Sequence, residues 1–255
     1  KLRCATAAGG AILAAMKETQ LSFKRYEKKY LLSREKYLEL WSQLESRLMP
    51  DQFFQSTVMS LYYDWDDFRL IRSSIEQPVY KEKLRLRSYD VPGEESPVFV
   101  ELKKKYKGIV YKRRVRMTER EAEDYLSGRA AAPAEDQISR EIDWFLKTNP
   151  VQPKVLIACD RKAYVGREEP GLRLTFDSSI RWRDTQLRLT EGDHGRELLE
   201  DGQVLLEIKM PESAPLWLAE LLSSLEIFPR SFSKYGQCYK NQLIEKYFDG
   251  VMVIA

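Results

Sequence analysis

Alternating apolar and polar residues run through most of the chain and predict β-strands. Side chains two residues apart on a strand share one face. In Leu84–Arg87, two leucines alternate with two arginines, and in Leu206–Met210, Glu207 and Lys209 alternate with apolar residues. Eight segments are predicted as strands: Phe23–Leu32, Thr57–Tyr63, Lys83–Tyr89, Val98–Lys105, Ile109–Met117, Val155–Val165, Leu172–Asp177 and Val204–Met210. Eight strands are about the number that closes a small barrel with a ligand-sized interior.

Helix signals lie between these strands. We expect a first helix that is capped by Ser33 and reaches about Leu48, and a second that begins at the capping box Thr118–Glu121 and ends at Gly128. A third helix is expected to be capped by Ser139 and to end near Asn149. A fourth begins at Ser213 and Pro215 and reaches about Glu226, and a fifth spans Lys240–Phe248. We expect Trp41, Trp144 and Trp217 on these helices to lie in the core. The helices are too few for a doubly wound parallel sheet, so the fold class is α+β, an antiparallel eight-stranded barrel with flanking helices.

The length and cysteine content limit the domain organisation and the compartment. A chain of 255 residues suits one large domain. We expect residues 1–15, which are rich in Ala and Gly, to be a tag or upstream segment, and residues 16–255, from Met16 onward, to form the domain. No apolar run approaches the roughly 20 residues of a membrane span. Three scattered cysteines and one histidine disfavour a zinc site and suit a reducing compartment, so we expect a cytoplasmic protein.

The polar faces of the predicted strands are mostly basic. They carry Arg25, Glu27 and Lys29; Arg85 and Arg87; Glu101, Lys103 and Lys105; Lys112, Arg114 and Arg116; Arg173, Thr175 and Asp177; and Glu207 and Lys209. One interpretation is a half-solvated antiparallel sheet with its polar side in water. Solvated faces usually mix signs, however, whereas this one is basic on nearly every strand and its acids recur as acid-x-Lys.

An inward-facing basic surface would need an anion. Clustered Lys and Arg repel each other strongly in a low-dielectric interior, so the cluster indicates a bound polyanion. Arginine matches phosphate oxygens bidentately, and lysine acts as a point charge. Isolated glutamates in such a surface suit Mg²⁺ or Mn²⁺ that bridges to phosphates. Among residues 112–116 we expect Lys112 and Arg114 to contact the anion.

Nine short motifs, taken in order, resemble those of the VTC domain, the catalytic domain of polyphosphate polymerases. That family belongs to the triphosphate tunnel metalloenzymes, alongside the CYTH-type triphosphatases. The motifs are Tyr26–Tyr30, Leu61–Asp64, Leu84–Arg87, Val100–Lys103, Tyr111–Arg114, Asp160–Tyr164, Leu172–Asp177, Leu206–Lys209 and Phe232–Tyr235. The resemblance spans roughly Phe23–Leu243. It implies a tunnel-shaped barrel that transfers the ATP γ-phosphoryl group to a growing polyphosphate chain and releases ADP.

The resemblance also implies residue roles. Lys29, Arg85, Arg87, Lys103, Lys112, Arg161, Arg173 and Lys209 would line the tunnel and hold phosphates. Ser233 and Lys234 would contact nucleotide or chain phosphate near one mouth. Glu207 would bind Mn²⁺ or Mg²⁺, with Glu27 and Glu101 as further metal candidates. Relatives that carry a phosphate-sensing domain and membrane helices are longer, so this domain would act alone or with a separate membrane subunit, at times peripheral to a membrane.

Two positions depart from the family pattern. CYTH triphosphatases carry acid-x-acid-x-Lys on the first strand, and Arg25 stands at the first of these positions, which favours the polymerase branch. Cys159 stands where the VTC family often has Tyr, and we interpret it as a buried filler.

Three other functions share the basic tunnel. A triphosphate hydrolase and a non-catalytic polyphosphate or inositol-polyphosphate binding module would both use it. Nucleic-acid binding is disfavoured, because Tyr62, Tyr63 and Tyr164, which could stack on bases, are expected to pack outside the barrel or to support its wall.

Overall fold

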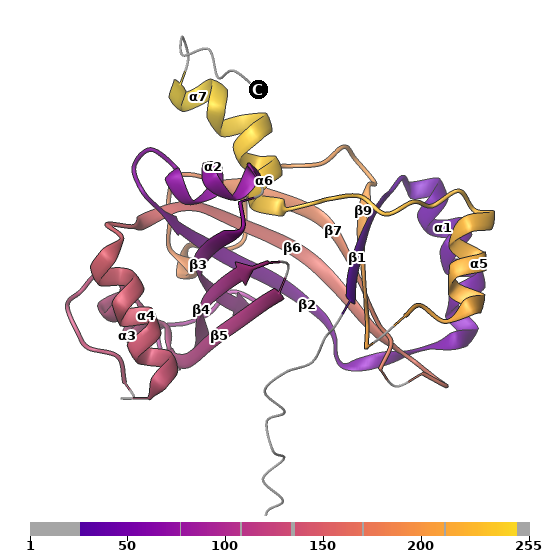
Figure 1. The fold of residues 1–255 in the computed structure, drawn as a ribbon, viewed down its shortest axis with the longest axis horizontal. Coiled ribbons are helices and arrows are strands. Elements are labelled where there is room, and N and C mark those ends of the chain that lie inside the picture. The colour runs from indigo at the N-terminus through magenta and orange to yellow at the C-terminus, as the bar shows by residue number, and fades with distance from the viewer. Residues whose placement is uncertain are drawn as a thin grey trace, which may run out of the picture.

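The structure, a computed structural model, describes residues 26–76, 78–107, 109–133, 136–169, 171–211 and 213–248 (Figure 1). In chain order its elements are β1 (Tyr26–Leu32), α1 (Arg34–Leu44), β2 (Leu48–Asp64), α2 (Arg69–Ile75), β3 (Tyr80–Tyr89), β4 (Pro97–Tyr106), β5 (Ile109–Thr118), α3 (Glu119–Leu126), α4 (Gln137–Thr148), β6 (Gln152–Gly166), β7 (Arg173–Arg183), β8 (Arg196–Glu197), β9 (Val204–Met210), α5 (Leu216–Ser224), α6 (Lys234–Cys238) and α7 (Ile244–Phe248). The expected tag or upstream segment, residues 1–15, and Arg25 lie outside the described residues.

All the ladders of the sheet are antiparallel, and the prediction of an α+β fold with flanking helices is confirmed. The strand order is β1-β9-β7-β6-β2-β3-β4-β5, and the two-residue strand β8 pairs with β7. Each of the eight predicted strands corresponds to a strand on this path. The prediction of a closed barrel is wrong, because within the described chain β1 and β5 end the path without pairing to each other.

A chain segment that follows α5 lies beside the free edge of β1. The backbone N–H of Arg230 donates to the carbonyl of Lys29 at 2.7 Å. The Lys29 ammonium in turn donates to the carbonyl of Phe232 at 3.1 Å. This segment therefore covers part of the edge of β1 and uses a backbone acceptor that a neighbouring strand would otherwise need.

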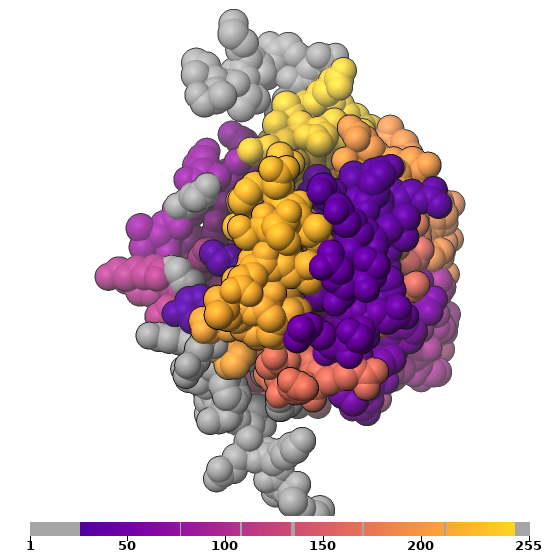
Figure 2. All heavy atoms as spheres, turned by 90° about the vertical axis from the view of Figure 1, so that its right-hand side faces the viewer, coloured from indigo at the N-terminus to yellow at the C-terminus, as the bar shows by residue number. Residues whose placement is uncertain are grey.

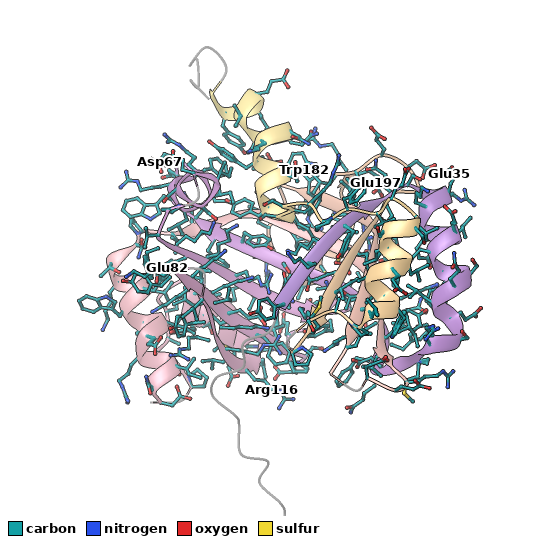
Figure 3. The ribbon with its side chains drawn as sticks, turned by 45° about the vertical axis from the view of Figure 1, so that its right-hand side comes forward. Glu35, Asp67, Glu82, Arg116, Trp182 and Glu197 are labelled. Atoms are coloured by element: carbon teal, nitrogen blue, oxygen red, sulfur yellow. The ribbon has the colours of Figure 1, made fainter. Side chains whose placement is uncertain are left out.

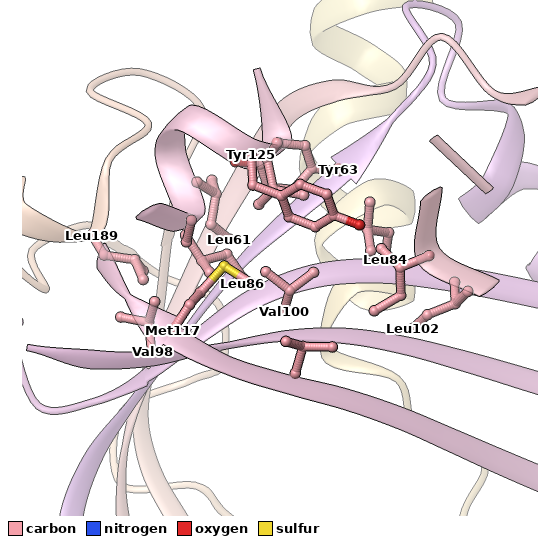
Figure 4. Packing of buried hydrophobic residues seen from close by; sticks show 14 of the residues in the cluster. Leu61, Tyr63, Leu84, Leu86, Val98, Val100, Leu102, Met117, Tyr125 and Leu189 are labelled. Atoms are coloured by element: carbon pink, nitrogen blue, oxygen red, sulfur yellow. The ribbon is translucent and has the colours of Figure 1, made fainter. Parts of the chain in front are cut away.

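Apolar residues on the outer, convex face of the sheet form two cores beneath the helices. One core joins Leu61, Leu84 and Val100 to Tyr125 of α3 (Figure 4). Phe145 of α4 belongs to the same core. The other lies under α1 and α5, which sit side by side over the sheet (Figure 2), and contains residues such as Leu40, Leu206 and Leu218. The apolar half of the alternation thus faces the helices, so the opposite, concave face receives the charged half.

A third core fills one end of the concave face. Val155 and Ile157 of β6 pack there with Tyr62, Tyr235 and Trp182, the last labelled in Figure 3. Trp182 reaches this side because the pairing of β6 with β7 shifts register near Ser179, whose φ is 45°. Of the three tyrosines considered for base stacking, Tyr62 lies in this core, while Tyr63 and Tyr164 lie in the convex ones.

Buried Asp64 fixes two helices at that end. Its carboxylate accepts the backbone N–H groups of Leu70 at 2.9 Å and Ile71 at 3.0 Å, in the first turn of α2. It also accepts the Tyr235 hydroxyl of α6 at 2.9 Å. The Tyr235 ring stacks on Tyr62, with 4.6 Å between the ring centroids. One carboxylate therefore ties α6 into the concave face.

Several helix predictions need correction. Asp136, not Ser139, caps α4, and the helical segment predicted to begin at residue 240 begins at Lys234. Helix α2 was not predicted, because its seven residues show no long apolar stripe. The capping box of Thr118 and Glu121 is confirmed. Trp144, expected in the core, is 70% exposed, since it lies on the solvent side of α4.

Candidate functional site

The concave face brings the predicted site residues together as two opposing walls. The "cation wall" is formed by β3, β4 and β5 and consists of Lys83, Arg85, Arg87, Glu101, Lys103, Lys112 and Arg114. The "mixed wall" is formed by β1, β9, β7 and β6 and consists of Glu27, Lys29, Glu207, Lys209, Asp177 and Arg161. Lys29 of the mixed wall donates to the carbonyl of Phe232, and Lys83 of the cation wall donates to the hydroxyl of the adjacent Ser233, so the two walls meet at this segment although β1 and β3 lie far apart in the strand order.

Glu101 organises the cation wall. Its side chain is 1% exposed and accepts hydrogen bonds from two strands. Arg85 on β3 donates through Nη2 at 2.6 Å, and Arg114 on β5 donates through Nε at 2.6 Å. The Lys112 ammonium lies 2.9 Å from Oε1, the oxygen that also accepts from Arg114, whereas Arg85 donates to Oε2. Both oxygens are therefore occupied by cations, and the proposed metal role of Glu101 stays a prediction.

The electrostatics of Glu101 follow from its partners. Burial alone would raise its pKa, but Arg85, Arg87 and Lys112 outweigh burial and hold that pKa well below its usual range. Burial likewise opposes the charge of Lys112 and lowers its pKa to about 8, even with Glu101 beside it. The cation wall thus contains more positive charge than its single carboxylate neutralises.

Arg87 and Arg85 are also held by hydroxyl groups of β2. Arg87 donates to the Ser60 hydroxyl from Nη2 at 3.1 Å and from Nε at 3.3 Å. Arg85 donates to the Tyr62 hydroxyl at 3.4 Å. Neutral hydroxyls orient the guanidinium groups without adding negative charge to the cation wall.

Asp177 plays the corresponding part on the mixed wall. It is fully buried and accepts both prongs of Arg161, at 2.6 and 2.7 Å, and the Lys234 ammonium at 2.5 Å. Burial raises its pKa, but Lys234 and Arg161 outweigh burial and the pKa lies well below its usual range. The predicted residues Arg161 and Lys234 are thus joined by an acid to which the sequence had assigned no role.

Glu207 and Glu27 share one lysine. The Lys29 ammonium lies 3.3 Å from Glu27 and 3.6 Å from Glu207, and Lys209 lies 2.5 Å from Glu207. Burial alone would raise the pKa of Glu207, but the charges of Lys209, Lys29 and Arg161 outweigh burial and lower this pKa to about 2. Glu207 therefore stays ionised, with its side chain 10% exposed toward the concave face.

These carboxylates fit a divalent metal that is shared with phosphate. The described residues contain no group of three His, Cys, Asp or Glu side chains able to enclose a metal by themselves. Mg²⁺ commonly uses only one or two carboxylates and takes its remaining ligands from water and substrate phosphates. Glu207 and Glu27 supply such a donor pair, at a position now lined by the ammonium group of Lys29.

Arg173 lies apart from the two walls. It is on the same face of β7 as Asp177 but four residues away, where it pairs with Asp51 of β2 at 3.2 Å and is half-exposed. Ser233 lies at the start of α6, where its hydroxyl accepts the Lys83 ammonium at 3.2 Å. The residues predicted to contact phosphate therefore extend from Arg173, next to β2, to Ser233 at the start of α6.

Lys83 and Asp177 are the site residues that sequence reasoning missed. Lys83 alternates with apolar residues in step with Arg85 and Arg87, so all three share one face of β3. This alternation was the sequence feature that could have identified Lys83. Asp177 belonged to a recognised motif, but its partners come from segments distant in the chain. Cys159 is buried beside them, with its Sγ 3.9 Å from the carbonyl of Val58, as the filler interpretation requires.

Comparisons with known proteins identify the family and support the fold. The sequence model of the VTC domain matches residues 24–242. No curated protein matches the chain. A solved structure from Bacillus halodurans, described as a candidate adenylate cyclase, superposes with a TM-score of 0.52 at 17% identity and covers 87% of this chain and 96% of its own. A second, from Hippeastrum, described as a candidate adenylyl cyclase with a dominant triphosphatase activity, has a TM-score of 0.52 at 16% identity and covers 84% and 94%.

Proposed function

Because this chain belongs to the VTC domain family, we propose that it is an ATP-dependent polyphosphate polymerase that works in the concave face of its sheet. The observation that carries this proposal is the charge of the cation wall. That wall carries six basic side chains from three adjacent strands and one carboxylate, Glu101, which pairs with four of them. A surface of this kind suits a long polyanion better than a small neutral ligand.

The proposed reaction is phosphoryl transfer between two phosphate compounds. A terminal oxygen of the polyphosphate chain attacks the γ-phosphorus of ATP, the new P–O bond forms, and the bond to the β-phosphate oxygen breaks. ADP leaves with the electron pair of that bond. No covalent enzyme intermediate is needed, because this chemistry depends mainly on positioning and charge neutralisation.

The walls would divide this work. Arg85, Arg87 and Arg161 would hold phosphate oxygens through guanidinium donors that are already oriented by Glu101, Ser60 and Asp177. Lys103, Lys112, Arg114, Lys29, Lys209 and Arg173 would add charge along the chain. Ser233 and Lys234 would contact nucleotide or chain phosphate beside α6.

Mn²⁺ or Mg²⁺ would be held by Glu207, with Glu27 as the second protein ligand. When bound, such an ion neutralises phosphate charge and polarises the γ-phosphoryl group. Glu207 is suited to this role, because its neighbours keep it ionised. Lys29 would then have to turn from the carboxylates toward phosphate.

The surroundings of the domain are also proposals. We place the protein in the cytoplasm, at times peripheral to a membrane, with ATP and polyphosphate as ligands and no nucleic acid. Among the described helices, none combines the length and apolar character that crossing a bilayer requires. A separate membrane subunit could receive the product.

A triphosphate hydrolase is the second candidate. The Hippeastrum structure, whose description reports triphosphatase activity, supports it through the shared fold. Arg25, at the first position of the CYTH acid motif, disfavours it, although that residue lies outside the described chain. A polyphosphate or inositol-polyphosphate sensor would use the same walls without turnover.

The deciding experiment measures both products at once. Purified protein is incubated with ATP and Mn²⁺ or Mg²⁺, and long-chain polyphosphate and ADP are assayed together, with Glu207→Ala and Arg173→Ala in parallel. Polymer that forms with ADP and disappears in the variants supports the polymerase. Free phosphate without polymer would establish the hydrolase instead, and tight binding of polyphosphate with neither product would establish a sensor.

A further inference from the structure

Two lysines differ from every other cation of the two walls. Each of the remaining cations has a carboxylate partner: Glu101 for Arg85, Arg87, Lys112 and Arg114, Asp177 for Arg161, and Glu207 for Lys29 and Lys209. Within the described part of the chain, neither Lys83 nor Lys103 makes a salt bridge. These two ammonium groups are therefore the unneutralised part of the site.

The two lysines are also direct neighbours. Lys83 on β3 and Lys103 on β4 are cross-strand partners, so their side chains leave the same face of the sheet at adjacent positions. Like charges placed directly opposite each other destabilise a sheet. The neutral Ser233 hydroxyl, 3.2 Å from the Lys83 ammonium, does not offset this repulsion. A protein that keeps such a pair needs another way to reduce the charge.

The groups that face Lys83 come from each neighbouring element. They are Lys81 and Arg85 on its own strand, Lys103 on β4, Lys29 on β1 and the Ser233 hydroxyl before α6, while Glu27 and Glu207 act on Lys103. Burial, followed by the charges of Lys103, Lys81, Lys29 and Arg85, lowers the pKa of Lys83 to about 7. Lys103 is open to solvent, yet desolvation by the surrounding walls also lowers its pKa.

We propose that Lys83 and Lys103 form a phosphate subsite in which Lys83 takes up a proton from solvent as the phosphate chain binds. The ligand class is a linear polyphosphate or nucleotide triphosphate end, which supplies negative oxygens to both ammonium groups and to Ser233. The inference rests on the proposed function only in requiring that the concave face binds polyphosphate. It adds a binding residue, Lys83, and a proton to the binding step.

The direction of the pH dependence follows from linkage. Bound phosphate favours the charged form, so the pKa of Lys83 is higher in the complex than in the free protein. The contribution of Lys83 to affinity is therefore fully present below the free pKa of about 7 and is lost as pH rises through the higher pKa of the complex. Between these two values, binding consumes protons.

The test is calorimetric titration of the full chain with tripolyphosphate in the presence of a chelator. Titrations in two buffers with different ionisation enthalpies, at about pH 8, give the number of protons taken up on binding. Lys83→Met and Lys83→Arg are compared with wild type, and Lys104→Met is the matched control, because Lys104 lies on the opposite face and pairs with Glu141. Protons that tripolyphosphate itself takes up or releases are the same for every variant, so they cancel when the variants are compared.

We expect wild type and Lys104→Met to take up roughly half to one proton more than Lys83→Met or Lys83→Arg, since the methionine cannot be protonated and the arginine is already charged. Lys83→Met should weaken tripolyphosphate binding by about 10-fold at neutral pH, and Lys83→Arg should not. Equal proton uptake by wild type and Lys83→Met would overturn the subsite, even if polymer forms. Proton uptake without polymer synthesis would support the subsite and contradict the polymerase instead.

Discussion

The two walls of the concave face use buried carboxylates in different ways. On the cation wall, Glu101 holds cations from two neighbouring strands and is outnumbered by them. On the mixed wall, Asp177 is matched by Arg161 and Lys234, and Glu207 by Lys29 and Lys209. One wall is therefore left with excess positive charge, while on the other wall each acid is matched by nearby cations.

This difference shows how a sheet can hold a dense basic surface before substrate arrives. A buried carboxylate neutralises part of the charge and fixes guanidinium geometry, while the remaining positive charge is left without a protein partner. Each wall can be perturbed separately, because the two do not share a carboxylate.

The largest expected effect is on stability, from the acid of the cation wall. Glu101→Gln keeps the side-chain shape but leaves its cations without a counter-charge, so the free energy of unfolding should fall by about 3–5 kcal/mol. Urea unfolding at low salt measures this. Added tripolyphosphate should recover much of the loss, since it binds the folded state.

The matched control for this substitution lies on the convex face. Glu141→Gln removes a partly exposed carboxylate that pairs with Lys104 and Arg113, and it should cost less than about 1 kcal/mol. Equal losses in the Glu101 and Glu141 variants would contradict the organising role of Glu101.

The next effect separates turnover from binding on the mixed wall. Glu207→Gln should lower the polymerisation rate by about 100-fold, because it removes the main proposed metal ligand. Its affinity for tripolyphosphate without metal should stay close to that of wild type. Arg85→Met on the cation wall should lose both polymerisation activity and metal-free tripolyphosphate binding, as product assays and equilibrium binding would show. A Glu207→Gln protein that loses metal-free binding would refute this division of labour.

Acid should also distinguish the Glu207 variant. The pKa of Glu207 is lowered in the folded state, to about 2, so its contribution to stability is present above the unfolded value near 4.5 and declines as pH falls toward 2. Between pH 5 and pH 3, wild type should lose about 2 kcal/mol more unfolding free energy than Glu207→Gln. Urea titrations at the two pH values test this, and parallel losses in both proteins would show that the ion pairs of Glu207 contribute little.

The smallest effect compares two adjacent arginines of β5. Arg114 faces the concave surface, whereas Arg113 pairs with Glu141 of α4 on the convex side at 3.0 Å. Arg114→Met should weaken tripolyphosphate binding by about 10-fold, and Arg113→Met by less than about 2-fold. If both weaken binding equally, the surface that binds polyphosphate is not the concave face.

The strands and their faces could be predicted from sequence, because alternation is a local property. Leu84 and Leu86 had to oppose Arg85 and Arg87 in whatever sheet formed, and the structure places the leucines in a convex core. The same argument identified most members of both walls. The parity of Lys83 was equally visible, but a single lysine at the start of a strand does not differ from a solvated one.

The rest depends on contacts between distant segments. The backbone hydrogen bond from Arg230 to Lys29 and the pairing of Lys234 with Asp177 join residues far apart in the chain, and no local pattern encodes them. The register shift near Ser179 reverses which side chains of β7 face inward, so period-two counting fails beyond it. For these reasons the open sheet and the position of α6 could not be predicted.

The dependence of the site on α6 has a consequence for synthesis on the ribosome. Strand β1 leaves first, but its pairing partner, β9, follows only after Val204, and Lys234 reaches Asp177 later still. Local elements such as the β4–β5 hairpin can form early, whereas Asp177 of the mixed wall gains its partner Lys234 from α6 only when nearly the whole domain has emerged. A nascent chain therefore passes through a stage in which the basic strands have been made but the concave face is incomplete, so a ligand of that face would bind only after the fold is assembled.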